Sequence, residues 1–137
     1  MLPVILQLPK IIDKRGNLSY FEFPNQIPFE IKRIYWIYDV PGGEIRGGHA
    51  FKVQQELIIV LSGSLDVITY DGTDEKKFSL NRSNYGLYIP NNLWRHMENF
   101  ATNTLALVVS STSFDENDYI RDKDEFIKLK TDEKNSV

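Results

Sequence analysis

The segment "GEIRGGHAFKVQQELIIVLSG" (residues 43–63) decides the fold expected for this chain. Its second half, "ELIIVLSG" (residues 56–63), is an apolar run rich in β-branched residues that ends at a glycine, as a buried strand entering a turn does. In the first half, one residue separates His49 from Phe51. Side chains alternate along a strand, so these two rings are expected on the same face.

Further segments of strand character lie on both sides of this stretch, with turn residues between them. Asp71-Gly72 is the expected tip of a hairpin. A helical pattern is confined to residues 115–130, where one or two short helices are predicted. We therefore expect an all-β fold, a sandwich or barrel, in a single domain over residues 1–137. The predicted strands are residues 18–23, 31–40, 56–63, 64–70, 85–90 and 104–111.

The overall composition is that of a globular protein, with 42% hydrophobic and 26% charged residues. The net charge of −3 argues against nucleic acid as a partner, because duplex binding needs a concentrated basic face. The chain has no cysteine, and so no disulfide or thiolate metal site is expected. No apolar run has the length of a membrane helix, and no basic leader is recognised. We expect a cytoplasmic protein without a membrane partner.

The spacing of four residues in the opening segment is more specific than its composition. Gly43, His49, Glu56 and Gly63 follow the first characteristic pattern of the cupin barrels. In that pattern a second histidine stands two residues after the first, and here Phe51 takes its place. A phenyl ring can neither bind a metal nor carry a proton.

A second cupin pattern supplies a further histidine after a Pro-x-Gly turn. The stretch "GLYIPNNLWRHMEN" has Pro90, with Asn92 at the glycine position and Arg95 at the ligand position. His96 is one residue away and would face the opposite side of a strand. Two of four ligand positions then carry a metal-binding side chain, and a cation stands at a third. We therefore expect no metal site.

Seven stretches, running in order along nearly the whole chain, resemble the dTDP-4-keto-6-deoxyglucose 3,4-ketoisomerases, the metal-free cupins of deoxyaminosugar biosynthesis. The resemblance implies a cupin-type jelly-roll barrel of antiparallel strands and a dTDP-4-keto-6-deoxy sugar as the substrate. It also implies no cofactor, and a homodimer that usually exchanges N-terminal strands. The stretches are "IIDKRGNL" (11–18), "IPFEIKRIYWIYD" (27–39), "RGGHAFK" (46–52), "SGSLDV" (62–67), "GLYIP" (86–90), "LW" (93–94) and "FDENDYIRDKDEF" (114–126).

The resemblance also implies roles for individual residues. His49 falls at the position of the principal acid/base histidine, and Tyr35 at that of an active-site tyrosine. Arg15, Gly16 and Arg46 fall where the family binds the nucleotide diphosphate or shapes the pocket. At residue 51 the family usually has a second histidine, and this chain has Phe51 instead. This difference leaves open whether the activity is full, redirected or lost.

Strand geometry limits which of the other expected substrate-binding residues can face the same side as His49. Arg46 and Lys52 each lie three residues from His49, so alternation puts both off the His49 face unless a bulge occurs at residues 47–48. Phe51 is either a core residue or an aromatic wall against the sugar or thymine. Among the remaining aromatic residues, Trp36, Tyr38 and Tyr88 are expected mostly in the core, with stacking on the nucleotide base as the alternative.

We expect a 3,4-ketoisomerase, with two alternative functions. A 3,4-ketoisomerase needs one base that removes the C3 proton and returns a proton to C4, and a histidine suits both steps near neutral pH. Tyr35 would polarise the carbonyl oxygen or relay a proton. A 3,5-epimerase of the same sugar would need a second acid on the opposite ring face. A non-catalytic dTDP-sugar-binding protein would bind without exchanging any carbon-bound proton.

Overall fold

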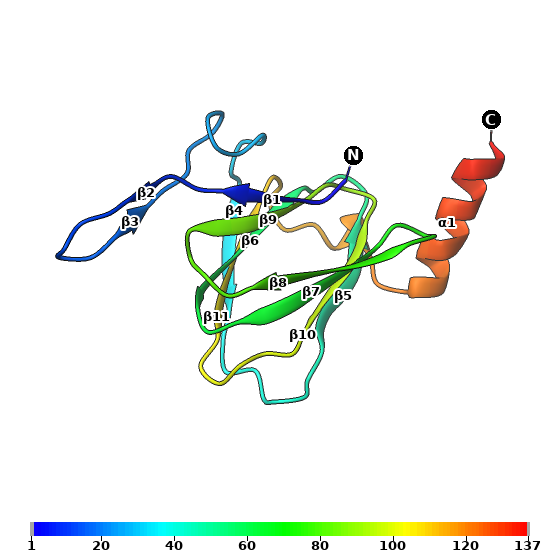
Figure 1. Ribbon diagram of the computed structural model, residues 1–137. Helices are drawn as coiled ribbons and strands as arrows, with labels where there is room; N and C mark the ends of the chain where they lie inside the picture. The colour runs from blue at the N-terminus through cyan, green and yellow to red at the C-terminus, as the bar shows by residue number, and fades with distance from the viewer. Residues whose placement is uncertain (1, 137) are drawn as a thin grey trace.

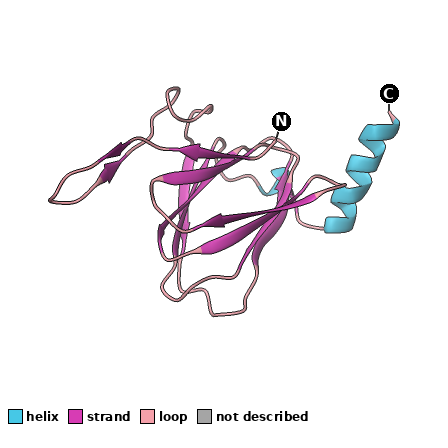
Figure 2. Ribbon diagram, in the orientation of Figure 1, coloured by secondary structure: helices cyan, strands magenta, loops and turns pink. Residues whose placement is uncertain are grey.

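The computed structural model describes residues 2–136 and consists of two five-stranded antiparallel sheets packed face to face, with a helix at the C-terminal end (Figures 1 and 2). In order across the first sheet lie β1 (Val4–Gln7), β9 (Tyr85–Ile89), β6 (Glu56–Ser62), β11 (Leu105–Ser110) and β4 (Arg33–Ile37). The second sheet has the order β12 (Tyr119–Ile120), β5 (Arg46–Phe51), β10 (Trp94–Glu98), β7 (Leu65–Tyr70) and β8 (Glu75–Leu80). The remaining elements are β2 (Lys10–Ile11), β3 (Leu18–Ser19), the 3-10 helix η1 (Glu116–Asp118) and α1 (Lys123–Asn135).

The core fills the space between the two sheets. The interior strands β6 and β7 are buried along most of their length, and in β6 this explains the apolar run from Leu57 to Leu61. The all-β jelly-roll prediction is confirmed, and so are the helices near the C-terminus. The main core cluster includes Ile58, Val60, Leu65, Val67, Leu80, Leu87, Met97 and Val108.

Two sequence-based expectations need correction. The predicted strand 18–23 is only two residues long, because the chain leaves β3 after Ser19 and turns at Pro24. Trp36 and Tyr38 are 59% and 60% exposed and are not core residues. They belong to β4 and its continuation at the edge of the first sheet, where only the alternate side chains face inward. Tyr88, by contrast, is buried as expected.

A bulge in β5 places the residues on either side of it on one face. Arg95 pairs with His49, and Met97 pairs with Arg46, so two steps along β10 correspond to three along β5. Gly47 lies in this bulge with a φ of 72°, a conformation that favours glycine. The extra residue cancels the alternation that would otherwise separate Arg46 from His49.

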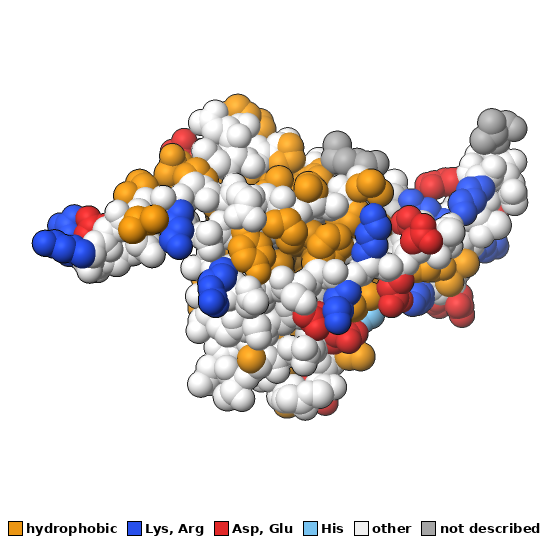
Figure 3. All heavy atoms as spheres, viewed as in Figure 1, with side chains coloured by type: hydrophobic (Ala, Val, Ile, Leu, Met, Phe, Trp, Pro, Cys, Tyr) orange, Lys and Arg blue, Asp and Glu red, His pale blue; other side chains and the backbone are white. Residues whose placement is uncertain are grey.

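The two ends of the chain add to the sandwich in different ways. β12 pairs with β5 and extends the second sheet, and α1 packs through Phe126 against Trp94. The β2–β3 hairpin projects away from the sandwich (Figure 1). Hydrophobic side chains lie along this hairpin, and basic ones gather at its end (Figure 3). Within residues 2–136, no helix is long and apolar enough to cross a membrane.

Candidate active site

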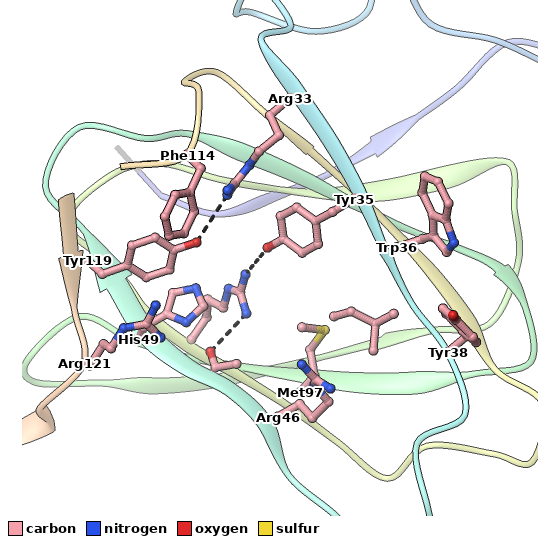
Figure 4. Close-up of a pocket in the computed structure, with 13 residues that line it drawn as sticks. Arg33, Tyr35, Trp36, Tyr38, Arg46, His49, Met97, Phe114, Tyr119 and Arg121 are labelled. Carbon is pink, nitrogen blue, oxygen red and sulfur yellow. Dashed lines mark hydrogen bonds between the residues drawn. The ribbon is translucent and has the colours of Figure 1, made fainter. Parts of the chain in front are cut away.

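A cavity of about 440 Å³ opens between β4, β5, β10 and the segment around β12 (Figure 4). Its volume lies in the range of sites that hold a small molecule. Every ionisable side chain in its wall is a base or a phenol, and none of the described residues there contributes a carboxylate. The lining residues are Arg33, Tyr35, Trp36, Ile37, Tyr38, Arg46, Gly47, His49, Arg95, Met97, Phe114, Tyr119 and Arg121.

His49 projects from β5 into this cavity and is 7% exposed. Aromatic rings hold the imidazole on two sides: Phe51 with its centroid 4.7 Å away and Tyr119 at 5.0 Å, both edge-on. The Nε2 atom is buried and has no hydrogen-bond partner among the described residues. The packing therefore fixes the ring without engaging Nε2 in a hydrogen bond.

The environment of His49 keeps the imidazole neutral. Burial lowers its pKa from 6.5 to about 2, and the positive charges of Arg95, Arg121 and Arg33 act in the same direction. A neutral imidazole has a free lone pair and is able to accept a proton. An anion bound among these arginines would offset their charge and raise the pKa of His49 toward its ordinary value.

Tyr35 reaches the same cavity from β4. Its hydroxyl oxygen accepts a hydrogen bond of 3.1 Å from Nη2 of Arg95. Burial, followed by the negative charge of Glu56, raises the pKa of Tyr35 to about 12. The phenol thus keeps its proton at neutral pH and can donate it to an oxygen in the cavity.

Arg95 and Glu56 form an ion pair in the interior, with each side chain 1% exposed. Nε and Nη2 of Arg95 donate to the carboxylate at 2.7–3.1 Å, and Nη1 donates to the Gly47 carbonyl at 3.0 Å. Burial alone would lower the pKa of Arg95, but Glu56 and Tyr35 together outweigh it and raise the pKa. The guanidinium is therefore a permanent cation in the cavity wall.

This ion pair occupies two of the four positions where a metal-binding cupin carries its ligands. Both carboxylate oxygens of Glu56 accept bonds from Arg95, which stands at the position of the last histidine. Across residues 2–136, no three His, Cys, Asp or Glu side chains come together as a metal centre requires. The residues present do not fit a divalent metal.

The other arginines add further positive charge to the cavity wall. Arg33 donates to the Tyr119 hydroxyl at 3.2 Å, and the guanidinium of Arg121 lies 4.1 Å from the centroid of the Tyr119 ring. Arg121 pairs with Glu116, whereas Arg33 and Arg46 have no carboxylate within 4.0 Å among the described residues. Guanidinium groups without a counterion bind phosphate groups well.

Of the residues predicted from the sequence, the structure brings Tyr35, Arg46 and His49 together in the cavity. Arg46 reaches it because of the bulge at Gly47. Phe51 is 4% exposed and lies behind the imidazole; it is not part of the wall.

The structure does not bring the other three predicted residues to this cavity. Arg15 and Gly16 form the turn of the projecting hairpin, where the Arg15 side chain is 85% exposed and pairs with Asp13 at 2.9 Å. Lys52 follows the last residue of β5 and lines a different, smaller hollow beside α1. The Lys52 side chain lies at another part of the surface, and the projecting hairpin places Arg15 and Gly16 away from the cavity.

Sequence reasoning gave no catalytic or substrate-binding role to five charged or aromatic residues of the wall, although it placed one of them, Arg95, at a cupin ligand position. Alternation was a usable signal for some of them, because Arg33 lies two residues before Tyr35, and Tyr119 lies two residues before Arg121. Nothing in the sequence indicates that residues near 120 return to β5, since β12 is only two residues long. The missed residues are Arg33, Arg95, Phe114, Tyr119 and Arg121.

Comparison with known proteins agrees with the resemblance noted in the sequence. The family model described as "FdtA: WxcM-like, C-terminal" matches residues 2–131. The TDP-4-oxo-6-deoxy-alpha-D-glucose-3,4-oxoisomerase of Aneurinibacillus thermoaerophilus is 40% identical over 124 residues, which cover 90% of this chain and 89% of the relative.

Solved structures extend the likeness to the fold. A 3,4-ketoisomerase from Helicobacter canadensis superimposes with a TM-score of 0.93 at 43% identity, covering 96% of this chain and 98% of the other. The sugar 3,4-ketoisomerase QdtA from Thermoanaerobacterium thermosaccharolyticum, solved in complex with TDP, has a TM-score of 0.93 at 35% identity, with 96% of each chain covered. The chain therefore belongs to the FdtA/WxcM-like family, the family of the sugar-nucleotide 3,4-ketoisomerases that its sequence resembles.

Proposed function

We propose that this protein moves the keto group of a dTDP-4-keto-6-deoxy sugar from C4 to C3. The observation that carries this proposal is the pairing of a neutral, buried His49 with a protonated Tyr35 in one cavity, where no described wall residue is acidic. One group accepts a proton and the other donates to an oxygen, as migration of a carbonyl requires. The relatives' activities and the TDP bound to QdtA support the choice of substrate.

In the first half of the reaction, His49 removes the proton from C3, which the adjacent C4 carbonyl makes acidic. The C–H electron pair forms the C3=C4 double bond, and the carbonyl pair moves to O4, where Tyr35 stabilises the charge by hydrogen bonding. In the second half, O4 gains a proton and O3 loses one. The double bond then takes the proton from His49 at C4, leaving a carbonyl at C3. The substrate and the product have the same atoms.

The arginines bind the diphosphate. Arg33 and Arg46 have no carboxylate partner among the described residues, and both Arg33 and Arg121 contact Tyr119, the first at its hydroxyl and the second over its ring (Figure 4). The negative charge of the diphosphate then lies near His49 and offsets the cations that lower its pKa. Substrate binding thereby makes His49 a stronger base.

We also propose a homodimer, because the projecting hairpin exposes apolar side chains that its own sandwich does not cover. Ile11 is 55% exposed, Ile12 79% and Leu18 54%. Packing of this hairpin on a second copy would bury these residues, and Arg15 with Gly16 would act at the second copy's cavity. Ile12→Asp should convert the dimer to a monomer in analytical ultracentrifugation; a monomeric wild-type protein contradicts the proposal.

The primary test is proton NMR of the protein with dTDP-4-keto-6-deoxyglucose in deuterium oxide. Loss of the C3 proton signal together with a new 3-keto species supports the isomerase. Exchange at C3 and C5 without carbonyl migration indicates a 3,5-epimerase. Binding of the nucleotide sugar with no exchange indicates a non-catalytic binding protein.

His49→Asn tests the assigned base in the same assay. We expect the rate of C3 exchange to fall about a thousandfold, within the range for removal of a general base. Binding of dTDP, measured by calorimetry, should stay within about threefold of wild type, since Asn retains the arginines. Turnover at the wild-type rate would show that another residue removes the proton.

A further inference from the structure

We propose that Glu56 is a positioning residue for this reaction: through Arg95 it holds the Tyr35 hydroxyl so that the single phenolic proton is offered to the cavity. This inference rests on the proposed function and adds a residue to it. Glu56 itself lies outside the cavity wall and does not touch the substrate site. Its effect is transmitted by hydrogen bonds.

The Arg95 guanidinium has five N–H groups, and the carboxylate determines where they point. Nε donates to Oε1 of Glu56 at 3.1 Å, and Nη2 donates to the two carboxylate oxygens at 2.7 Å and 2.8 Å. These contacts define the plane of the guanidinium. In that plane Nη2 also reaches the Tyr35 hydroxyl at 3.1 Å, and Nη1 reaches the Gly47 carbonyl at 3.0 Å.

This arrangement leaves Tyr35 one use for its proton. A hydroxyl has one proton and two lone pairs, and Arg95 donates to one of the lone pairs. A guanidinium cannot accept a hydrogen bond, so the proton cannot be shared back with Arg95. No other residue in 2–136 accepts from the Tyr35 hydroxyl, whose oxygen points toward the space beside His49 (Figure 4). Tyr35 is thus oriented as a donor to whatever oxygen enters the cavity.

Glu56 also sets the charge around the phenol. Its carboxylate is the only anion among the described groups that face Tyr35, and it balances the cation of Arg95. Without it, Arg95 would be an uncompensated buried charge held by one hydroxyl and one carbonyl. The pKa of Tyr35 would then fall, because a nearby cation favours the phenolate. The charged and titratable groups facing Tyr35 are Glu56 from β6, Arg95 from β10, His49 from β5, Tyr119 from β12 and Arg33 from β4.

The test replaces the carboxylate with its neutral isostere, Glu56→Gln, and follows kcat, KM and their pH dependence with dTDP-4-keto-6-deoxyglucose. We expect kcat to fall about 100-fold, as when one oriented donor is lost, and KM to change by less than about threefold. The alkaline limb of kcat should move to lower pH. The matched control is Asp66→Asn, another buried carboxylate, which binds Ser79 and Asn99 outside the cavity wall and should leave kcat and its pH profile unchanged.

A double-mutant cycle separates positioning from general structural support. If Glu56 acts through the phenol, Glu56→Gln should have little further effect on kcat in a Tyr35→Phe background. Equal losses in both backgrounds, or a kcat of Glu56→Gln within about threefold of wild type, would overturn the proposal.

Two further measurements keep the proposal testable if a variant or the substrate fails. If Glu56→Gln does not fold, the double variant Glu56→Gln/Arg95→Met can be used, because it removes both charges of the buried pair. We expect this double variant to bind dTDP and to show the same loss of kcat. A wild-type kcat in the double variant would refute the positioning role. If the wild-type protein does not move the carbonyl, the proposed function is wrong, but the positioning role of Glu56 can still be tested. Tyrosinate absorbance, read against Tyr35→Phe, then still reports whether Glu56→Gln lowers the pKa of Tyr35, and an unchanged pKa refutes the positioning role.

Discussion

The ring of Phe51 meets the imidazole of His49 edge-on, with the centroids 4.7 Å apart and the planes at 73°. Both side chains project from the same face of β5 because they lie two residues apart. Phe51 is 4% exposed and does not reach the cavity. At this position a metal-binding cupin would carry a second ligand, and here the side chain supports the first histidine from behind.

Phe51→His should therefore weaken the protein instead of adding a second proton carrier. The new imidazole would be buried beside His49 and Tyr119 with no hydrogen-bond partner, at a cost of about 2 kcal/mol. We expect a lower free energy of unfolding in urea and a lower kcat. Phe51→Leu, which keeps the site apolar, serves as the control and should lose less activity. A rise in kcat in Phe51→His would show that the phenyl ring limits turnover.

Acid should destabilise the protein through His49. Its pKa is about 2 in the folded protein, against the ordinary value of 6.5 in the unfolded chain, so below pH 6.5 the unfolded chain binds a proton that the folded chain does not. The free energy of unfolding is then unaffected by His49 above pH 6.5. It falls as the pH decreases toward 2, by up to about 1.4 kcal/mol per pH unit.

Urea unfolding between about pH 7.5 and pH 5 checks this slope. His49→Asn should reduce this slope by close to one proton. Equal slopes in wild type and His49→Asn would mean that the buried imidazole takes up its proton without unfolding.

The bulge in β5 can be tested with two neighbouring glycines. A Cβ at Gly47 would meet Nη1 of Arg95, and its φ of 72° is unfavourable for alanine. At Gly48 the nearest atom to an added Cβ belongs to Trp94, 3.5 Å away, which is an ordinary contact. Gly47→Ala should therefore cost about 1 kcal/mol or more of stability and reduce kcat, while Gly48→Ala should do neither. Thermal unfolding and the isomerase assay give both quantities.

Removing Arg33 should weaken substrate binding more than chemistry. Arg33 lines the cavity without a carboxylate partner among the described residues, so Arg33→Gln removes a cation available to the diphosphate. We expect KM and the Kd for dTDP to rise about tenfold or more, with kcat within about threefold. Arg82→Gln, at an exposed site outside the cavity, is the control. A large loss of kcat at constant Kd would place Arg33 in the chemical step.

The sequence predicts those parts of the fold that depend on local pattern. The β6–β7 turn at Gly63, the hairpin tip at Asp71-Gly72 and the run of β6 all follow from turn residues and apolar content, and the structure has each of them. The cupin spacing indicated His49, the family resemblance indicated Tyr35, and both line the cavity. Whether Arg46 faces the cavity depended on a bulge in β5. Only the pairing of β5 with β10 shows that this bulge exists.

Residues brought in by long-range contacts could not be predicted in this way. Tyr119 and Arg121 reach the cavity because β12 pairs with β5, and a two-residue strand leaves no periodicity to read. Trp36 has a large apolar side chain, as core residues do, but it lies on the exposed face of an edge strand. Hydrophobicity alone does not tell an edge strand from a central one.

The pairing of β12 with β5 makes the cavity depend on residues near the C-terminal end of the chain. Asp118 accepts the backbone N–H groups of Val53 and Gln54 at 2.7 Å and 3.0 Å, and this clamp joins segments more than 60 residues apart in the chain. Tyr119 follows Asp118 directly, and so this clamp also holds the part of the cavity wall that carries Tyr119 and Arg121 against β5. One wall of the cavity is therefore built by residues close to the C-terminal end of the chain, and its position depends on a two-residue strand and a single buried carboxylate.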